Sequence, residues 1–310
     1  MTGLELSKKY YEEYGRPMLE AEFADILDLL AIGFVGSGSD RFGFDDEISQ
    51  DHDFEPGFCI FVPGEEKIDS RTEFKLERAY AKLPKEFMGF SRQMMSPVGG
   101  NRNGVTRTAE FYKKLVGSED GYLSDQAWLF VPDYSLAEAT NGEVFFDGLG
   151  EFTAIRKRLM KMPEDARLKR IAGNVLLMAQ SGQYNYLRCI KHGECEAAQL
   201  ACYEFVNAAI KVKFLLAKKY APYYKWSFRA LRQLEGGDAL AEKLSMLILS
   251  DASSEEKYYA IESVASDIIG ELCDQGITKA TCSDLEKHAY SINDMIKDNN
   301  IRNSHVLAAV

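Results

Sequence analysis

A glycine- and serine-rich turn followed by two aspartates is the part of the sequence best suited to chemistry. The turn consists of Gly36, Ser37, Gly38 and Ser39. It follows an apolar segment, and glycine lets backbone N–H groups approach phosphate oxygens closely. Asp51 and Asp53, one residue apart, would place both carboxylates on one face of an extended segment. Because Mg²⁺ is commonly held by one or two carboxylates together with substrate phosphates, these two features predict nucleotide chemistry.

Each feature also has a simpler interpretation. Glycine-serine turns are common after strands, so the turn by itself is a weak signal of phosphate binding. Asp51 and Asp53 could belong to a loop in which their carboxylates accept hydrogen bonds from neighbouring amides. His52, between them, should face away from both, which favours a structural or hydrogen-bonding role.

The order of these motifs also resembles a known signature. The chain carries, in order, an apolar residue, a Gly-Ser turn, a spacer, Asp-x-Asp and a strand. This order is similar to the pattern of the DNA polymerase beta-like nucleotidyltransferase superfamily. Within it, the chain resembles kanamycin nucleotidyltransferase-type bacterial enzymes and a group of uncharacterised nucleotidyltransferase-like proteins. Further similar runs are residues 43–47, 142–147, 184–186 and 220–226. The resemblance extends over most of the chain, and the turn and Asp-x-Asp are its specific motifs.

The resemblance implies an enzyme that moves a nucleoside monophosphate from ATP or another NTP to an acceptor hydroxyl, with release of pyrophosphate. The turn residues Gly36, Ser37, Gly38 and Ser39 would then hold the β- and γ-phosphates. Asp51 and Asp53 would bind Mg²⁺, and metal ions beside the transferred phosphorus would neutralise charge on the attacking and leaving oxygens. The acceptor would be a small molecule, including an antibiotic, or a protein side chain; the base preference and acceptor identity are left open.

A third carboxylate, supplied by a later strand in this superfamily, is the uncertain part of the site. Asp147, at the end of the expected strand 143–147, is one candidate, and Glu110, just after the strand near Val105, is another. If neither occupies the site, the alternative is a catalytically inactive nucleotide-binding or protein-interaction module of the same fold.

Two cations in the second half of the chain are further candidates for binding a triphosphate. Arg188 follows the polar-aromatic run Tyr184-Asn185-Tyr186, and Lys225 lies among tyrosines and a tryptophan. Aromatic faces can stack on a base or an acceptor ring, and the cations can pair with phosphate. The alternative for both groups is packing at helix junctions.

Composition narrows the remaining choices. A net charge of −11 and a pI near 5.1 argue against binding bulk nucleic acid, which requires a basic face. The six cysteines form no C-x-x-C pair, so we expect free thiols in a reducing, cytoplasmic setting. No apolar run approaches the length of a membrane-spanning helix, and no signal sequence is evident, so we expect no membrane association. The oligomeric state is left open, with a homodimer among the possibilities.

The elements that would position these residues change in character near residue 150. Before it, strands and short helices alternate, which predicts a nucleotidyltransferase-type mixed sheet with flanking helices. The expected strands cover residues 31–35, 59–62, 87–90, 105–108 and 143–147, and the expected helices cover 4–22 and 68–83. After it, we expect a helical bundle with 194–219 as its central helix. The fold is therefore predicted as α+β, with domains 1–150 and 151–310.

Overall fold

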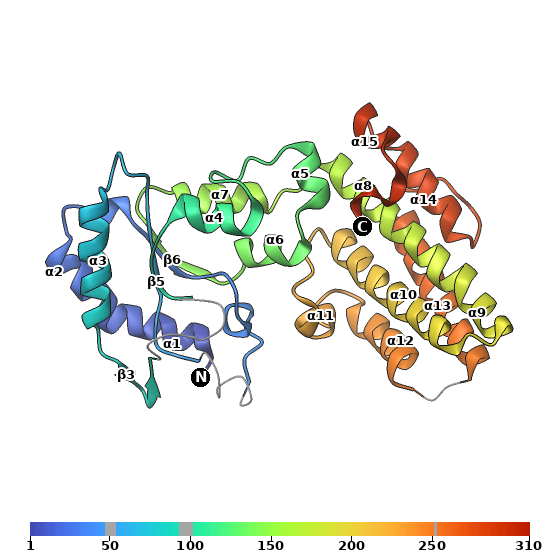
Figure 1. The fold of residues 1–310 in the computed structure, drawn as a ribbon, viewed down its shortest axis with the longest axis horizontal. Helices are drawn as coiled ribbons and strands as arrows, with labels where there is room; N and C mark the ends of the chain where they lie inside the picture. The colour runs from blue at the N-terminus through green and yellow to red at the C-terminus, as the bar shows by residue number, and fades with distance from the viewer. Residues whose placement is uncertain (47–53, 93–101, 251–252) are drawn as a thin grey trace. The chain divides into compact units, whose positions relative to one another are not determined.

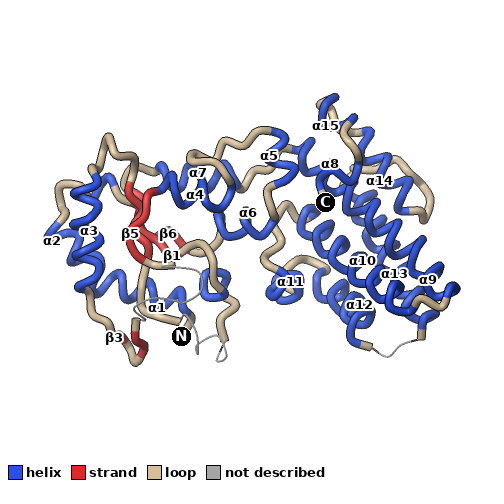
Figure 2. Tube along the Cα trace, viewed as in Figure 1, coloured by secondary structure: helices blue, strands red, loops and turns tan. Residues whose placement is uncertain are grey.

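The computed structural model describes residues 1–46, 54–92, 102–250 and 253–310. Contacts divide the chain into two compact units. The first contains residues 1–122 and 135–161, and the second contains residues 123–134 and 162–310. The first unit holds a small mixed sheet with helices, whereas the second is helical throughout its described part (Figure 2). The predicted α+β fold is therefore confirmed.

The first unit is built on a sheet with the strand order β5-β2-β1-β6. The strands are β1 (Ala31–Phe34), β2 (Cys59–Val62), β5 (Gly104–Arg107) and β6 (Glu143–Asp147). β1 is antiparallel to both of its neighbours, and β2 and β5 are parallel. The register pairs Gly33 of β1 with Cys59 of β2, so β2 begins at the end of the sheet where β1 ends.

Helices cover both faces of this sheet (Figure 1). The helices are α1 (Gly3–Tyr10), α2 (Arg16–Glu22), α3 (Ser70–Lys82), α4 (Thr108–Val116) and α7 (Glu151–Leu159). Successive side chains of a strand point to opposite faces. Ile60 accordingly packs with residues of α1 and α3, whereas Phe61 stacks on Phe152 of α7 at a ring separation of 4.2 Å and contacts Phe111 of α4.

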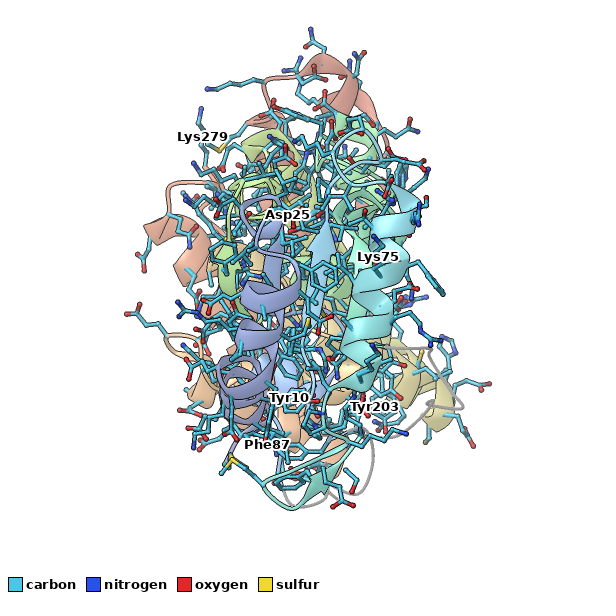
Figure 3. All side chains as sticks on the ribbon, turned by 90° about the vertical axis from the view of Figure 1, so that its left-hand side faces the viewer. Tyr10, Asp25, Lys75, Phe87, Tyr203 and Lys279 are labelled. Atoms are coloured by element: carbon cyan, nitrogen blue, oxygen red, sulfur yellow. The ribbon has the colours of Figure 1, made fainter. Side chains whose placement is uncertain are left out.

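The face covered by α1 and α3 contains an aromatic cluster. Tyr10 of α1 is completely buried, its ring centre lies 5.4 Å from that of Phe87, and its hydroxyl donates to the Pro84 carbonyl (Figure 3). The predicted single strand 87–90 is wrong. It is a hairpin of β3 (Glu86–Phe87) and β4 (Phe90–Ser91), turning through Met88 and Gly89, both of which have positive φ.

The second unit is a bundle arranged around α10 (Cys195–Leu216). This helix packs on α8 (Glu164–Met178), α12 (Gly237–Leu249) and α13 (Ser254–Asp274). The other helices are α5 (Asp125–Phe130), α6 (Asp133–Thr140, which begins here and continues in the first unit), α9 (Leu187–His192), α11 (Tyr224–Leu231), α14 (Leu285–Asp294) and α15 (Asn299–Asn303). The predicted central position of this helix is confirmed, because its buried face is lined by apolar side chains.

The division between the units differs from the predicted boundary at residue 150. α7 belongs to the first unit because Phe152 packs in the aromatic layer over the sheet. α5 and the first residues of α6 belong to the second unit, where the Trp128 and Val131 carbonyls accept hydrogen bonds from Arg170 of α8.

Candidate functional site

The glycine-serine turn begins directly after β1. Gly36 and Gly38 have φ of 101° and 132°, a region that side chains disfavour, so glycine is required for this path. The turn then enters a short 3₁₀ helix, Ser39–Phe42. Sequence order therefore places a tight glycine turn at the end of a buried strand, as predicted.

A clamp from the loop before β6 holds the start of the turn. The Gly36 N–H donates to Asn141 Oδ1 at 2.8 Å, and Asn141 Nδ2 donates back to the Gly36 carbonyl at 2.7 Å. Arg156 of α7 in turn donates to the carbonyls of Asn141 and Gly142. The turn is thus fixed at its first residue, and the Gly36 N–H is already used.

The rest of the turn carries backbone donors with no acceptor in the described part of the chain. Within the described residues, the backbone N–H groups of Ser37, Gly38 and Ser39 have no hydrogen-bond partner. The Ser37 hydroxyl donates to Glu138 Oε2 of α6 at 2.8 Å. Neighbouring N–H groups in a glycine turn form a concave site for an anion. Among the described carboxylates, Glu138 contacts this turn through Ser37, and Asp40 borders Gly38.

A buried guanidinium lies beneath the turn. Arg41 Nη1 donates to both carboxylate oxygens of Asp40, at 2.9 and 2.8 Å, and both side chains are almost fully buried. Its Nε donates to the Val35 carbonyl, and its guanidinium lies 4.0 Å from the centre of the Phe34 ring. This arrangement ties the 3₁₀ helix to the end of β1 and brings a positive charge beside the turn.

A second guanidinium approaches the turn from the chain that leads into β5. A Cβ built on Gly38 would lie 2.3 Å from Asp40 Oδ1, 2.7 Å from Arg102 Nη1 and 3.0 Å from Arg41 Nη1, so one carboxylate and both cations border this glycine. Burial lowers the pKa of the Arg102 guanidinium, and the charge of Arg41 lowers it further, while Asp40 opposes the change. The two guanidinium groups repel each other, and the Asp40 carboxylate beside them offsets part of that repulsion. An anion bound at the turn would offset more of it.

Asn103 extends this group toward the start of β2. Its Oδ1 accepts from Arg41 Nη2 at 2.8 Å, and its Nδ2 donates to Glu55 Oε1 at 3.3 Å. Cys59, the first residue of β2, is buried, and burial raises the pKa of its thiol. A raised pKa disfavours the thiolate form, so Cys59 is better suited to packing than to nucleophilic attack.

The structure does not bring either predicted third carboxylate to the turn. Asp147 pairs with Ala31, at the opposite end of β1 from the turn, and its two oxygens accept from the backbone N–H groups of Gly150 and Thr153. Glu110 is exposed in the first turn of α4, which follows the end of β5 at that same far end of the sheet. The strand directions explain both placements, because β5 and β6 begin near the turn and run away from it.

The remaining predicted residues lie elsewhere. Asp51 and Asp53, with His52, fall outside the described residues, so their roles stay predictions. Within the described ranges, no group of three or more His, Cys, Asp or Glu side chains could hold a metal ion. Arg188 and Lys225 belong to the second unit, where both are exposed and pack against aromatic rings, Arg188 over Tyr184 and Lys225 over Trp226.

Sequence reasoning missed several residues that shape the site: Arg41, Arg102, Asn103, Glu138 and Asn141. Asn141-Gly142 has the composition of a turn, which does not indicate a role at the site. Arg102 and Asn103 lie in a Gly/Asn-rich stretch that is typical of a loop, and the cation inside this stretch is the available signal. The others become neighbours of the turn only through strand pairing, so no local pattern identifies them.

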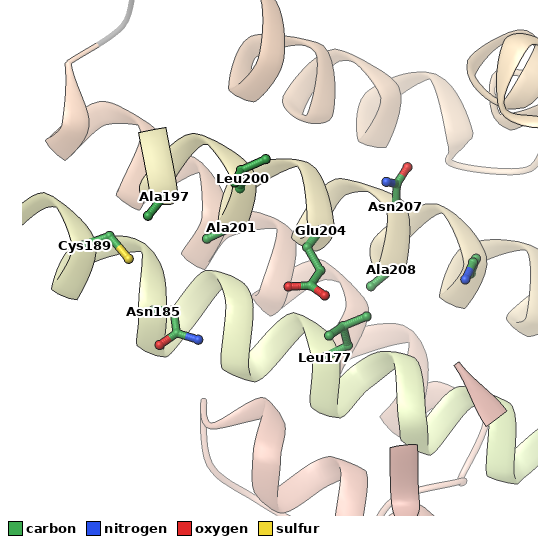
Figure 4. Close-up of a pocket in the computed structure, with 10 residues that line it drawn as sticks. Leu177, Asn185, Cys189, Ala197, Leu200, Ala201, Glu204, Asn207 and Ala208 are labelled. Carbon is green, nitrogen blue, oxygen red and sulfur yellow. The ribbon is translucent and has the colours of Figure 1, made fainter. Parts of the chain in front are cut away.

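The second unit contains two concavities of its own. One, of about 640 Å³, is an open groove between α10 and the continuous helix of the preceding segment, lined by residues such as Leu177, Leu200 and Glu204 (Figure 4). The other, of about 510 Å³, is lined by the loop between α5 and α6, by α10 and by the segment leading into α11. Asn207 and Lys211 line both.

Comparisons with known proteins give limited matches. A domain family described as a domain of unknown function (DUF4037) matches residues 128–227. No curated protein matches the chain. A solved structure of a nucleotidyltransferase-like protein from Exiguobacterium sibiricum is similar, with 11% identity and a TM-score of 0.39, and the match covers 86% of this chain and 77% of that chain. Among the described helices, none is both long and apolar enough to span a membrane.

Proposed function

We propose that the protein is a Mg²⁺-dependent nucleotidyltransferase that binds the triphosphate of an NTP at the glycine-serine turn. The observation that carries this proposal is the set of unused N–H groups of Ser37, Gly38 and Ser39 beside the guanidinium groups of Arg41 and Arg102. Phosphate oxygens accept from N–H groups and pair with guanidinium, so one tetrahedral anion would satisfy both features.

The reaction that fits is in-line displacement at the α-phosphorus of the nucleotide. An acceptor hydroxyl oxygen forms the new P–O bond, the bond to the β-phosphate oxygen breaks, pyrophosphate leaves, and the hydroxyl proton passes to a base or solvent. The turn would hold the leaving pyrophosphate, which gains negative charge as the bond breaks. The acceptor is a hydroxyl on a small molecule or a protein, as the sequence suggests.

The position of Glu138 supports a role for a divalent cation. Its carboxylate accepts from Ser37 Oγ within the turn, where it would repel a triphosphate unless a cation lay between them. We assign Glu138 as the third carboxylate, in place of Asp147 and Glu110, with Asp51 and Asp53 as the other metal ligands. Bound Mg²⁺ would neutralise charge on the phosphate oxygens.

Two glycines of the same loop provide a matched test of triphosphate binding. Gly38→Ala places a methyl group against the guanidinium groups and narrows the turn, whereas Gly43→Ala, also at positive φ, meets nothing within 4 Å. With calorimetric titration of Mg-ATP, we expect Gly38→Ala to weaken binding about tenfold or more, or ~1.4 kcal/mol, and Gly43→Ala to leave it nearly unchanged. Equal affinity in both variants would refute binding at the turn.

Transfer is tested separately from binding. With an α-labelled NTP, Mg²⁺ and a panel of hydroxylated acceptors, the wild type should release pyrophosphate and label an acceptor. An Asp51→Asn, Asp53→Asn variant and a Glu138→Gln variant should each lose this activity, whereas Glu12→Gln, on the surface of the first unit, should keep it. Unchanged turnover in the aspartate double variant would contradict the mechanism.

The position of Asp147 favours a second candidate function, a nucleotide-binding module without transfer. Asp147 is engaged in capping α7 and does not contribute a carboxylate at the turn. The module predicts tight binding of NTP by the wild type and no labelled acceptor across the panel. It also predicts that the Glu138→Gln variant binds NTP at least as tightly as the wild type, because this change removes a negative charge beside the turn.

A further inference from the structure

The cavity of about 510 Å³ in the second unit has the features of a small-molecule site. Its volume lies in the range of ligand pockets, and its walls combine apolar side chains with a few polar groups. Phe130, Val131 and Pro222 supply apolar surface, and Asp133, Arg170 and Lys211 supply charge. All of its lining residues belong to the second unit, so it is separate from the glycine-serine turn.

Asp133 is a buried carboxylate with unused acceptor capacity. Only 10% of its side chain is exposed; Arg170 Nη2 lies 3.0 Å from its Oδ1, yet Asp133 accepts no hydrogen bond from any described residue. Burial raises the pKa of this carboxyl, and Arg170 and Lys211 oppose the rise. Buried carboxylates are normally well supplied with hydrogen bonds, so a donor on a bound molecule would stabilise this one.

Arg170 holds Asp133 at the cavity wall. Its Nη1 donates to the carbonyls of Trp128 and Val131, which fixes the loop before Asp133, and its buried Nε has no partner in the described part of the chain. The wall therefore contains a rigidly placed carboxylate whose charge is balanced by a neighbouring guanidinium. Such a carboxylate is suited to a neutral N–H or O–H donor.

Tyrosine rings form another wall of the cavity. Tyr134 and Tyr223 meet edge to face at 5.9 Å, and Tyr223 and Tyr224 lie 4.5 Å apart. All three rings are substantially exposed, Tyr224 at 74%. Exposed aromatic faces beside a cavity are surfaces on which a planar ring can stack.

Lys211 adds a cation without an ion-pair partner among the described residues. It is partly buried on α10, lines the cavity, and forms no hydrogen bond or ion pair with any described residue. Lys211 and Arg170 are positively charged and Asp133 is negatively charged, so these three lining side chains carry one net positive charge. This excess positive charge disfavours a cationic ligand and favours one that carries an anionic group.

We propose that this cavity binds a nucleoside monophosphate. Its base would stack on the tyrosine rings, an amino group of the base would donate to Asp133, and its phosphate would pair with Lys211. Lys211 has no hydrogen bond or ion pair with a described residue, Asp133 accepts no hydrogen bond from one, and the tyrosine rings keep exposed surface. The inference does not depend on the proposed transfer reaction, because it concerns another unit and a ligand without a triphosphate.

Calorimetric titration with AMP, in the absence of Mg²⁺, tests this inference on the full chain. We expect Lys211→Gln and Tyr224→Ala each to weaken AMP binding about tenfold. Lys219→Gln and Tyr259→Ala are matched controls, because both residues are exposed and neither lines the cavity, and they should bind AMP as the wild type does. Circular dichroism should show all four variants folded.

Ligand analogues assign the individual contacts. Adenosine lacks the phosphate and should bind equally to wild type and Lys211→Gln. Purine riboside monophosphate lacks the amino group and should bind more weakly than AMP. Gly38→Ala, in the first unit, should leave AMP affinity unchanged, so failure of triphosphate binding at the turn is distinguished from failure at this cavity. Absence of AMP binding, unchanged AMP affinity in Lys211→Gln, or loss of AMP binding in Gly38→Ala would each overturn the proposal.

Discussion

Replacing Arg41 tests whether the buried ion pair beneath the glycine-serine turn holds the turn in place. In Arg41→Met, the side chain keeps a similar length and can still pack on Phe34, but the guanidinium is lost. Asp40 would then remain as a carboxylate with 8% side-chain exposure and no cation at 2.8 Å. The hydrogen bonds to the Val35 carbonyl and to Asn103 Oδ1 would disappear as well.

The expected loss of stability depends on which member of the ion pair remains buried after the substitution. Removing one member of a buried ion pair typically costs about 3–5 kcal/mol, because the remaining charge is buried without compensation. Replacing both charges is far less costly. We therefore expect Arg41→Met to lower the free energy of unfolding by about 4 kcal/mol, and Arg41→Met combined with Asp40→Asn to recover about half of that loss.

Urea denaturation, followed by far-ultraviolet circular dichroism and by tyrosine fluorescence, measures these free energies. Arg16→Met provides a control, because the Arg16–Glu20 pair is exposed and should contribute nothing measurable. A loss below about 1 kcal/mol in Arg41→Met, well under the range for a broken buried pair, would refute this reasoning. So would a double variant as unstable as Arg41→Met alone, since the burial of unpaired Asp40 would then not be the cause.

Three further predictions concern other buried features. Gly142→Ala should destabilise the protein by more than about 4 kcal/mol in the same urea experiment, because Gly142 has φ of 63° and its Cβ would lie 2.0 Å from the Phe34 carbonyl oxygen. Burial raises the pKa of Tyr80 and of Tyr112, so the folded state keeps both neutral. Their contribution to stability is complete below the ordinary tyrosine pKa near 10 and should be lost as pH rises above it; phenolate absorbance of these two should appear together with unfolding. Lys169→Met should lower the thermal midpoint, because the buried ammonium donates to one side-chain amide and two backbone carbonyls, and unpaired buried acceptors cost about 1–3 kcal/mol.

Strands bounded by clear turn signals were predictable from the sequence. The apolar run at residues 59–62 ends before Pro63-Gly64, and it forms β2 with the expected bounds. The strand predicted at 87–90 failed because a hairpin turn lies inside the apolar run, where Met88 adopts a positive φ that a residue pattern does not signal.

Helix ends were less predictable where packing overrode a local signal. The pattern of residues 165–180 predicts a helix that ends before Gly182. Instead the helix continues through a π-helical segment, Ala179–Tyr186, into α9. A Cβ on Gly182 would lie 2.4 Å from Phe205 Cδ2, so this glycine allows close packing of α10 rather than a break. Composition alone cannot distinguish these two uses of glycine.

The candidate site was predictable only in its local part. The turn could be recognised because its residues are contiguous. Arg102 and Glu138 are separated from it by many residues, and strand pairing alone brings them close. A group of side chains drawn from distant segments leaves no periodic signal in a single sequence.

Strand direction decides which carboxylates can take part in chemistry at the turn. β1 runs toward the turn, and β2, β5 and β6 all begin at that end of the sheet, so a residue at the far end of any of them is excluded. Asp147 ends β6, and its pairing with Ala31 therefore places it away from the turn however acidic the local sequence is. A carboxylate in the segment before β6 lies at the same end of the sheet as the turn. Glu138 is such a residue, and its side chain contacts Ser37. The two proposed functions thus make different demands on one residue: the proposed transfer would require Glu138 as a metal ligand, whereas the proposed binding would require only the N–H groups and cations of the turn.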